Sequence, residues 1–299
     1  MKLYMLVRRN IKLFFKDKSL CISALIAPLI LLFLFIAFLG NVYKDSLRSS
    51  LGEFPVSDTL VNGFAAGWLI SSLIAVCAVS IAFTANLTMV QDKIMGRAND
   101  LAVAPVKNST LALGYYLSTA IVTALVSYIA LFAGFIYIAI AGWNLSVSDV
   151  LLTVLDTFLL VLFGTALSSI VCRFLKSQGG ITAVEVVVSA AYGFLCGAYM
   201  PISSLAKGLQ DVLTFLPGTY GTSLLHEHLM GGAIDAIGAD GAPAELLKGV
   251  RDGFDCNLYF FDHAVPEWVS YLVLSLTVLA LVGVFVAICI LAAKKHKKK

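Results

Sequence analysis

Six apolar runs of membrane length constrain this 299-residue chain more than any of its motifs. Runs of about 20 apolar residues are typical of helices that cross a lipid bilayer. The runs are Leu20–Gly40, Val61–Met89, Leu111–Gly142, Val150–Cys172, Ile181–Tyr199 and Trp268–Ala293. The composition agrees, because 60% of the residues are hydrophobic and only 13% are charged. The sequence therefore predicts an all-α, polytopic membrane protein with about six transmembrane helices.

The basic residues predict how these helices are oriented. Sixteen of the 21 Lys and Arg residues lie before the first run, between the second and third, between the fourth and fifth, or after the sixth. Basic residues concentrate on the cytoplasmic side of membrane proteins. We therefore expect a multi-pass protein of the cell membrane with both termini in the cytoplasm.

The segments outside the runs have patterns of their own. The first 18 residues place apolar side chains at helical spacing with basic residues between them, which predicts an amphipathic interfacial helix. The apolar stretch between Pro201 and Tyr220 is too short to span, so we expect a short external re-entrant helical hairpin, with Pro217 stopping a helix and Gly218 permitting a tight turn. The predicted division is an interfacial helix at 1–18, transmembrane helices 1–5 at 19–200, the external hairpin at 201–220, an external loop or small subdomain at 221–266, transmembrane helix 6 at 267–293 and a basic cytoplasmic tail at 294–299.

A polar block separates the second and third runs on the side predicted to be cytoplasmic. It extends from Gln91 to Lys107 and contains Pro105, which predicts a helix over 90–104 that ends near the proline. A polar helix held at both ends by membrane spans can transmit a displacement, whereas a loose loop cannot. The block therefore indicates a mechanical input from outside the membrane.

The sequence contains no motif for enzymatic chemistry. It lacks the Walker A pattern Gly-x4-Gly-Lys-Ser/Thr, so we expect the chain to be no enzyme and to bind no ATP through a P-loop of its own. His226 and His228 are two positions apart, whereas paired zinc ligands on a helix are four apart. We therefore expect no metal site and place both histidines in the solvated external loop.

Two carboxylates lie inside predicted spans. Asp156 lies toward the outer edge of the fourth run and Glu185 toward the cytoplasmic edge of the fifth. Intramembrane carboxylates can relay protons or bind a cationic substrate, and they usually face protein or water. Their positions favour edge residues, with Asp156 in contact with solvent and Glu185 either solvated or paired to Arg173.

Two sets of motifs carry a resemblance to a known family. The first follows the second run and consists of Asp92-Lys93, Gly96, Leu101, Ala104-Pro105-Val106 and Gly114. The second follows the fifth run and consists of Gly193 to Tyr199, Pro201-Ile-Ser-Ser-Leu205, Leu209-Gln210 and Leu216-Pro-Gly-Thr-Tyr220. With these motifs the chain resembles, over nearly its whole length, the permease subunits of type-2 ABC exporters, which include daunorubicin-resistance and polysaccharide-export permeases. The long stretch 224–267 departs from simple members.

The resemblance implies a machine made of several chains. Two permease subunits, identical or different, would pair with two separate nucleotide-binding subunits that hold ATP and Mg²⁺, so this chain would need no cofactor. The machine would lie in membrane lipid, in the cell membrane of a bacterium, and would bind no nucleic acid. The helix at 90–104 would act as the coupling helix that docks on the ATPase. The residues expected to couple are Asp92, Lys93, Gly96, Arg97 and Asp100.

The resemblance also implies a substrate path at the interface of the two permeases, lined mainly by the first, second and fifth spans. We expect Phe33, Phe64, Trp68, Tyr192 and Phe194 to line it. The external hairpin would form a gate from Pro201, Leu205, Leu216, Pro217 and Gly218.

The cargo stays open at this point. The reading we favour is export of an amphipathic drug, as in multidrug efflux, an antimicrobial peptide or a lipid-like molecule. Export of a lipid-linked glycan by the same kind of machine is one alternative, and an ATP-independent secondary transporter is another. The acidic residues within 231–267 favour a cationic cargo over an anionic glycan at the exit.

Overall fold

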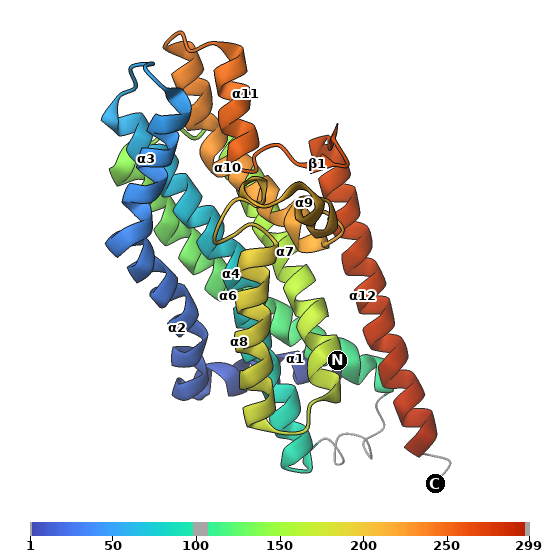
Figure 1. The fold of residues 1–299 in the computed structure, drawn as a ribbon. Helices are drawn as coiled ribbons and strands as arrows, with labels where there is room; N and C mark the ends of the chain where they lie inside the picture. Colours follow the sequence, from blue (N-terminus) through green and yellow to red (C-terminus); the bar gives the residue numbers. More distant parts are fainter. Residues whose placement is uncertain (1, 98–106, 297–299) are drawn as a thin grey trace.

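The computed structural model describes residues 2–97 and 107–296 and shows a helical bundle (Figure 1), which confirms the predicted all-α fold. A single β-hairpin, with two residues in each strand, interrupts the helices of this part of the chain. The elements are α1 (Lys2–Lys16), α2 (Lys18–Leu34), the π-helical turn η1 (Phe35–Leu39), α3 (Gly40–Leu51), α4 (Asp58–Ile94), α6 (Asn108–Gly142), α7 (Val147–Phe174), α8 (Gln178–Leu195), the 3-10 turn η2 (Ile202–Ser204), α9 (Lys207–Leu213), α10 (Pro217–Ala239), α11 (Ala244–Gly253), β1 (Tyr259–Phe260), β2 (His263–Ala264) and α12 (Glu267–His296).

Within the described residues, five helices are long and apolar enough to cross a membrane, namely α4, α6, α7, α8 and α12. They correspond to the second, third, fourth, fifth and sixth predicted runs. The first run lies in α2 and η1, which continue into α3 without leaving helical geometry, so that residues 18–51 form one helical path with a π-helical turn in it. The protein is therefore a multi-pass membrane protein.

Serine side chains mark where several of these helices begin. The Ser146 hydroxyl accepts the Asp149 amide, and the Asp149 carboxylate accepts the Ser146 amide in return, which forms a capping box at the start of α7. Ser57 and Ser177 cap α4 and α8 in the same way, each accepting an amide three residues further on. These caps satisfy backbone donors that a helix start leaves free.

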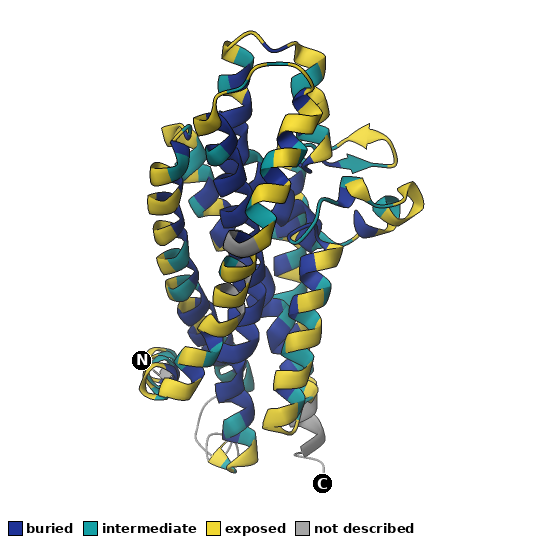
Figure 2. Cartoon of the chain, turned by 60° about the vertical axis from the view of Figure 1, so that its left-hand side comes forward, coloured by how far each residue is buried: buried dark blue, intermediate teal, exposed yellow. Residues whose placement is uncertain are grey.

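Helix α4 is the centre of the bundle and packs against α2, α6, α7, α8 and α10. Every residue of its most apolar stretch is buried, whereas less than a third of the corresponding stretch is buried in α6, α8 and α12. Figure 2 shows this contrast between a buried middle and exposed outer helices. Gly67 and Gly164 make the close packing possible, because a Cβ atom at Gly67 would collide with the Leu229 carbonyl of α10, and one at Gly164 with the Ala78 carbonyl of α4.

The two ends of the bundle carry different segments (Figure 1). Helix α1, the C-terminal end of α4 and the C-terminal end of α12 lie at one end. Helices α3 and α11 and the β-hairpin lie toward the other. Both described ends of the chain are thus on the same side of the bundle. We refer to these as the α1 end and the α11 end.

The stretch from 201 to 266 differs from the predicted hairpin followed by an external loop. Pro217 begins α10 instead of stopping a helix, since proline fits the first helical position, and α10 continues to Ala239 across the predicted boundary at residue 220. Gly218 lies in the first turn of α10 and approaches the Tyr192 ring so closely that a Cβ would clash. Two other glycines adopt a positive φ, Gly197 in the turn after α8, at +85°, and Gly241 after α10, at +99°.

Candidate functional site

A buried carboxylate ties three elements together at the α1 end. Asp92 of α4 is fully buried and accepts two hydrogen bonds from Arg9 of α1, at 2.7 Å from Nη1 to Oδ2 and 2.9 Å from Nη2 to Oδ1. The Tyr115 hydroxyl of α6 donates to Oδ2 at 2.7 Å, and Nη1 of Arg97 lies 3.7 Å from Oδ1. A two-pronged arginine–carboxylate contact fixes orientation as well as distance. These four residues, which we call the Asp92 cluster, therefore join α1, α4 and α6.

Lys93 extends this junction to a fourth helix. Its ammonium group donates to the backbone carbonyls of Cys172 and Arg173, each at 3.0 Å, at the C-terminal end of α7. Cations are favourable there because the last carbonyls of a helix lack partners within the helix and carry partial negative charge. Asp92 and Lys93, predicted to contact an ATPase, thus face into this chain.

The surface at this end is made by the residues that follow. Ile94 and Met95 are 51% and 59% exposed, and the Arg97 side chain is 47% exposed. Gly96 adopts a φ of +75°, a conformation that favours glycine. Of the five predicted coupling residues, Gly96 and Arg97 therefore lie at the accessible end of α4, while Asp100 falls outside the described residues together with the rest of the predicted helix after residue 97.

A groove of about 680 Å³ opens between α2, α4 and α8. Apolar and aromatic side chains line most of it, and Glu185 of α8 supplies the charge. The lining residues are Ser23, Ile26, Ile30, Leu34, Phe35, Leu39, Tyr43, Trp68, Leu69, Ser72, Ser80, Thr182, Glu185, Val186, Ser189, Ala190, Phe194, Ala198 and Tyr199. A volume of several hundred cubic ångströms with few polar groups suits a drug-sized ligand.

The five residues predicted to line the substrate path lie in three places: the groove, the core and the exposed surface of α2. Trp68 and Phe194 line the groove. Phe64 is instead buried edge-to-face against Phe254, with ring centroids 4.8 Å apart. Tyr192 is buried, with its hydroxyl within hydrogen-bond distance of Thr222 Oγ1 and the Gly218 carbonyl. Phe33 is 68% exposed on α2 and lies outside the described lining.

Glu185 has different neighbours from those predicted. Its Oε1 accepts hydrogen bonds from Thr84, at 2.6 Å, and Ser80, at 3.4 Å, both on α4. No ion pair to Arg173 or to another basic side chain is found within the described residues. Of the two predicted alternatives, the pairing with Arg173 is wrong, because the side chain turns toward α4 and the groove, where it is half-buried.

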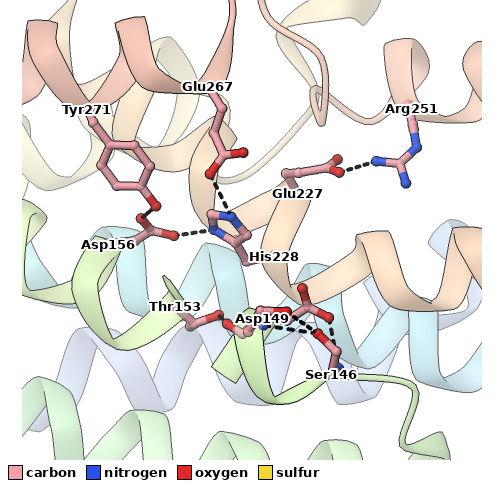
Figure 3. A network of polar contacts seen from close by, with 10 residues as sticks. Ser146, Asp149, Thr153, Asp156, Glu227, His228, Arg251, Glu267 and Tyr271 are labelled. Atoms are coloured by element: carbon pink, nitrogen blue, oxygen red, sulfur yellow. Dashed lines mark hydrogen bonds and ion pairs between the residues drawn. The ribbon is translucent and has the colours of Figure 1, made fainter. Parts of the chain in front are cut away.

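A second buried carboxylate lies toward the α11 end (Figure 3). Asp156 of α7 is fully buried, accepts the Tyr271 hydroxyl of α12 at 2.8 Å and lies 2.6 Å from Nδ1 of His228 on α10. Glu267, at the start of α12, lies 3.1 Å from Nε2 of the same ring. These four residues, which we call the Asp156 cluster, join α7, α10 and α12. Neither Asp156 nor His228 is a solvated edge or loop residue, contrary to the prediction.

His226 is buried as well, stacked on Trp68 with ring centroids 4.3 Å apart. The prediction of a solvated loop failed because α10 is rich in glycine and polar residues. Its apolar residues Leu224, Leu225, Leu229 and Ile234 nevertheless recur at helical spacing and are buried, and that periodicity was the available signal.

The predicted gate residues surround the turn between α8 and α10. Pro201, Leu205, Leu216 and Pro217 are half-buried, and Gly218 is buried. Asp255, which follows α11, holds this segment by accepting the backbone amides of Ile202 and Ser203. Tyr43 of α3 also donates to the Tyr199 carbonyl at 2.7 Å. The segment is therefore fastened to α3 and to the α11–β1 connection.

A comparison with known protein families agrees with this architecture. A model of the ABC-2 type transporter family matches residues 1–229, and the chain belongs to that family. It is a membrane permease component of an ABC transporter, a class that works with an ABC ATPase. No curated protein matches the sequence.

Proposed function

We propose that this chain is the permease half of an ATP-driven exporter that moves an amphipathic or lipid-like molecule out across the cell membrane. Two permease subunits would pair with two nucleotide-binding subunits that hold ATP and Mg²⁺. The observation that carries the proposal is the junction at the α1 end, where Asp92 and Lys93 join α1, α4, α6 and α7.

The junction supports the proposal through its stiffness. A push on the exposed end of α4, at Met95 and Arg97, would be transmitted to α1 through the Arg9–Asp92 contact and to α7 through Lys93. Helix α4 also forms one wall of the groove between α2 and α8. Displacement of α4 by an ATPase would therefore change the groove directly, which is the coupling that a transporter needs.

The groove and the gate segment complete the proposed path. We assign the groove to the substrate, and a second permease would close the side that α2, α4 and α8 leave open. The segment around Pro201 and Pro217, fastened by Asp255, would form the external gate. This orientation, with the α1 end in the cytoplasm, follows the distribution of basic residues.

Recovery of an ATPase with the chain tests the proposal. The tagged chain would be purified from its native membranes, and the associated nucleotide-binding subunit and ATPase activity quantified. We expect Arg97→Ala and Met95→Asp to reduce the recovered ATPase at least tenfold without changing the unfolding temperature of the permease. Arg48→Ala is the matched control, since the Arg48 side chain is 51% exposed and pairs with an aspartate like Arg97, but at the α11 end.

Two outcomes would contradict the proposal. The first is full ATPase recovery in both variants, which would show that the ATPase does not dock at the end of α4. The second is transport by the purified wild-type chain in vesicles without any ATPase or ATP, which would favour a secondary transporter.

A further inference from the structure

Glu185 gives the groove between α2, α4 and α8 a single sign of charge. It is the charged residue of the lining, and no Lys or Arg accompanies it there among the described residues. Carboxylates inside a membrane protein are costly unless they face a partner, and for that reason they mark binding sites and ion paths. A lone carboxylate in an apolar groove selects against anions and favours a cation.

The hydrogen bonds of Glu185 leave it able to bind such a cation. Oε1 accepts the hydroxyls of Thr84 and Ser80, which fix the side chain against α4. No donor within the described residues meets Oε2. Two neutral hydroxyls orient the carboxylate without neutralising its charge, so a cation bound in the groove would meet a negative charge that no basic residue of the described lining compensates.

Aromatic rings complete the chemical character of the groove. Phe35, Tyr43 and Trp68 form a continuous row, with the Tyr43 ring centroid 6.2 Å from that of Phe35 and 4.9 Å from that of Trp68. Phe194 and Tyr199 form a second pair at 5.1 Å. Aromatic faces attract cations, most strongly where water is excluded. Phe194, at 54% exposed, is the most accessible ring among these five side chains and can favour the same sign of charge as Glu185. Trp68, stacked on His226, supplies apolar wall instead.

We propose that this groove binds lipophilic organic cations, with Glu185 as the counter-ion and the aromatic rings as the apolar walls. The proposal rests on the proposed function for the transport role of the groove, and it narrows the cargo to amphipathic cations. It disfavours an anionic lipid-linked glycan, whose phosphates would meet Glu185 with no basic residue in the described lining to compensate.

Two hydrophobic ions of nearly equal shape provide a direct test. Tetraphenylphosphonium is a cation and tetraphenylborate an anion, so a groove that selects only by shape treats them alike. Binding of each labelled ion would be measured on the purified full-length chain in lipid nanodiscs, after subtraction of binding to protein-free nanodiscs, because the membrane itself takes up the two ions unequally. We expect saturable binding of tetraphenylphosphonium at least tenfold tighter than that of tetraphenylborate.

Glu185→Gln keeps the shape and hydrogen-bonding capacity of the side chain but removes its charge. We expect it to weaken tetraphenylphosphonium binding at least tenfold and to abolish the preference between the ions. Glu53→Gln is the matched control, because Glu53 is exposed in the α3–α4 connection, and it should bind like the wild type. If Glu185→Gln unfolds, the preference of the wild-type chain between the two ions still decides the question.

Equal binding of both ions by the wild type would overturn the proposal, as would unchanged cation affinity in folded Glu185→Gln. Either result would identify a non-selective apolar groove that lipid can fill. The assay needs no nucleotide-binding subunit, so its result is independent of the ATPase recovery above. A preparation that recovers the ATPase but shows no ion preference would retain the proposed function and reject only the cationic cargo.

Discussion

The Asp92 and Asp156 clusters place the same kind of group at two ends of the molecule. Each contains a fully buried carboxylate that accepts a tyrosine hydroxyl, from Tyr115 in one and Tyr271 in the other. The cations differ, since Arg9 holds Asp92 and His228 holds Asp156. Arginine stays charged at every physiological pH, whereas histidine exchanges its proton near neutrality.

The position of His228 between two carboxylates makes these contacts depend on whether the ring is protonated. Each of its ring nitrogens faces a carboxylate, one from Asp156 and one from Glu267, and only the imidazolium form carries a proton on both nitrogens. Desolvation lowers the pKa of His228, but the hydrogen bonds and charges of the two carboxylates outweigh it, so the pKa is raised above its ordinary value. The junction at the α1 end is therefore insensitive to pH near neutrality, and the junction of α7, α10 and α12 is sensitive.

The largest expected effect comes from Asp92→Ala. It leaves the guanidinium of Arg9 in a partly buried place without its counter-ion, and losing one partner of a buried pair costs about 3 kcal/mol. Circular dichroism, recorded while the detergent-solubilised chain unfolds, would measure this loss of stability. Asp58→Ala is the control at the other end of the same helix, because the Asp58 side chain is 83% exposed and its ion pair with Arg48 is solvated. Equal effects of the two substitutions would show that Asp92 is no more than a surface contact.

The second prediction concerns pH and His228. Because the folded state raises its pKa, the stabilisation is complete below the ordinary histidine pKa of about 6.5 and is lost as the pH rises through the folded value. We expect the free energy of unfolding to decrease by about 1.5 kcal/mol as the contact loses its charge. His228→Gln should remove this dependence of the unfolding free energy on pH. His263→Gln, at an exposed position in β2, should leave the dependence unchanged. If the free energy of unfolding of the wild type does not fall above pH 6.5, both clusters are insensitive to pH and the contrast between them is wrong.

A smaller effect separates charge from geometry in the Asp92 cluster. Arg9→Lys keeps the positive charge but replaces two directed hydrogen bonds with a point charge. We expect a loss of about 1 kcal/mol, the net contribution of one hydrogen bond, with no new dependence on pH near neutrality. Arg48→Lys is the control at the exposed ion pair. A loss as large as that of Asp92→Ala would mean that the arginine fork carries the whole contact.

Much of the fold could be predicted from hydropathy alone. Five of the six predicted runs coincide with long apolar helices, because the backbone must satisfy its hydrogen bonds internally in a membrane. The amphipathic start also forms a helix, α1. Hydropathy says less about α10, whose glycines and polar residues resemble a loop although the helix is buried against α4, α7 and α12.

The candidate site was harder to predict because its contacts join residues far apart in the chain. Asp92 lies near the end of α4, whose preceding turns are apolar on all sides, so no polar face of the helix indicates which way its side chain points. Its partner Arg9 lies 83 positions away. Asp156 and Glu185 could be singled out as intramembrane acids, but their partners His228 and Thr84 could not be named, since sequence spacing does not fix contacts between helices.

The smallest expected effect concerns Lys93, which decides whether α7 belongs to the junction at the α1 end. Lys93→Met keeps the length and the apolar part of the side chain but removes the donor to the Cys172 and Arg173 carbonyls. A cation at a helix C-terminus contributes about 0.5 kcal/mol, so the global stability should change little. Hydrogen exchange over residues 165–180 should nevertheless accelerate, because the last turn of α7 loses its cap, while Lys12→Met, exposed on α1, should leave it unchanged. Unchanged exchange in Lys93→Met would restrict the junction to α1, α4 and α6 and would remove α7 from the proposed route of coupling.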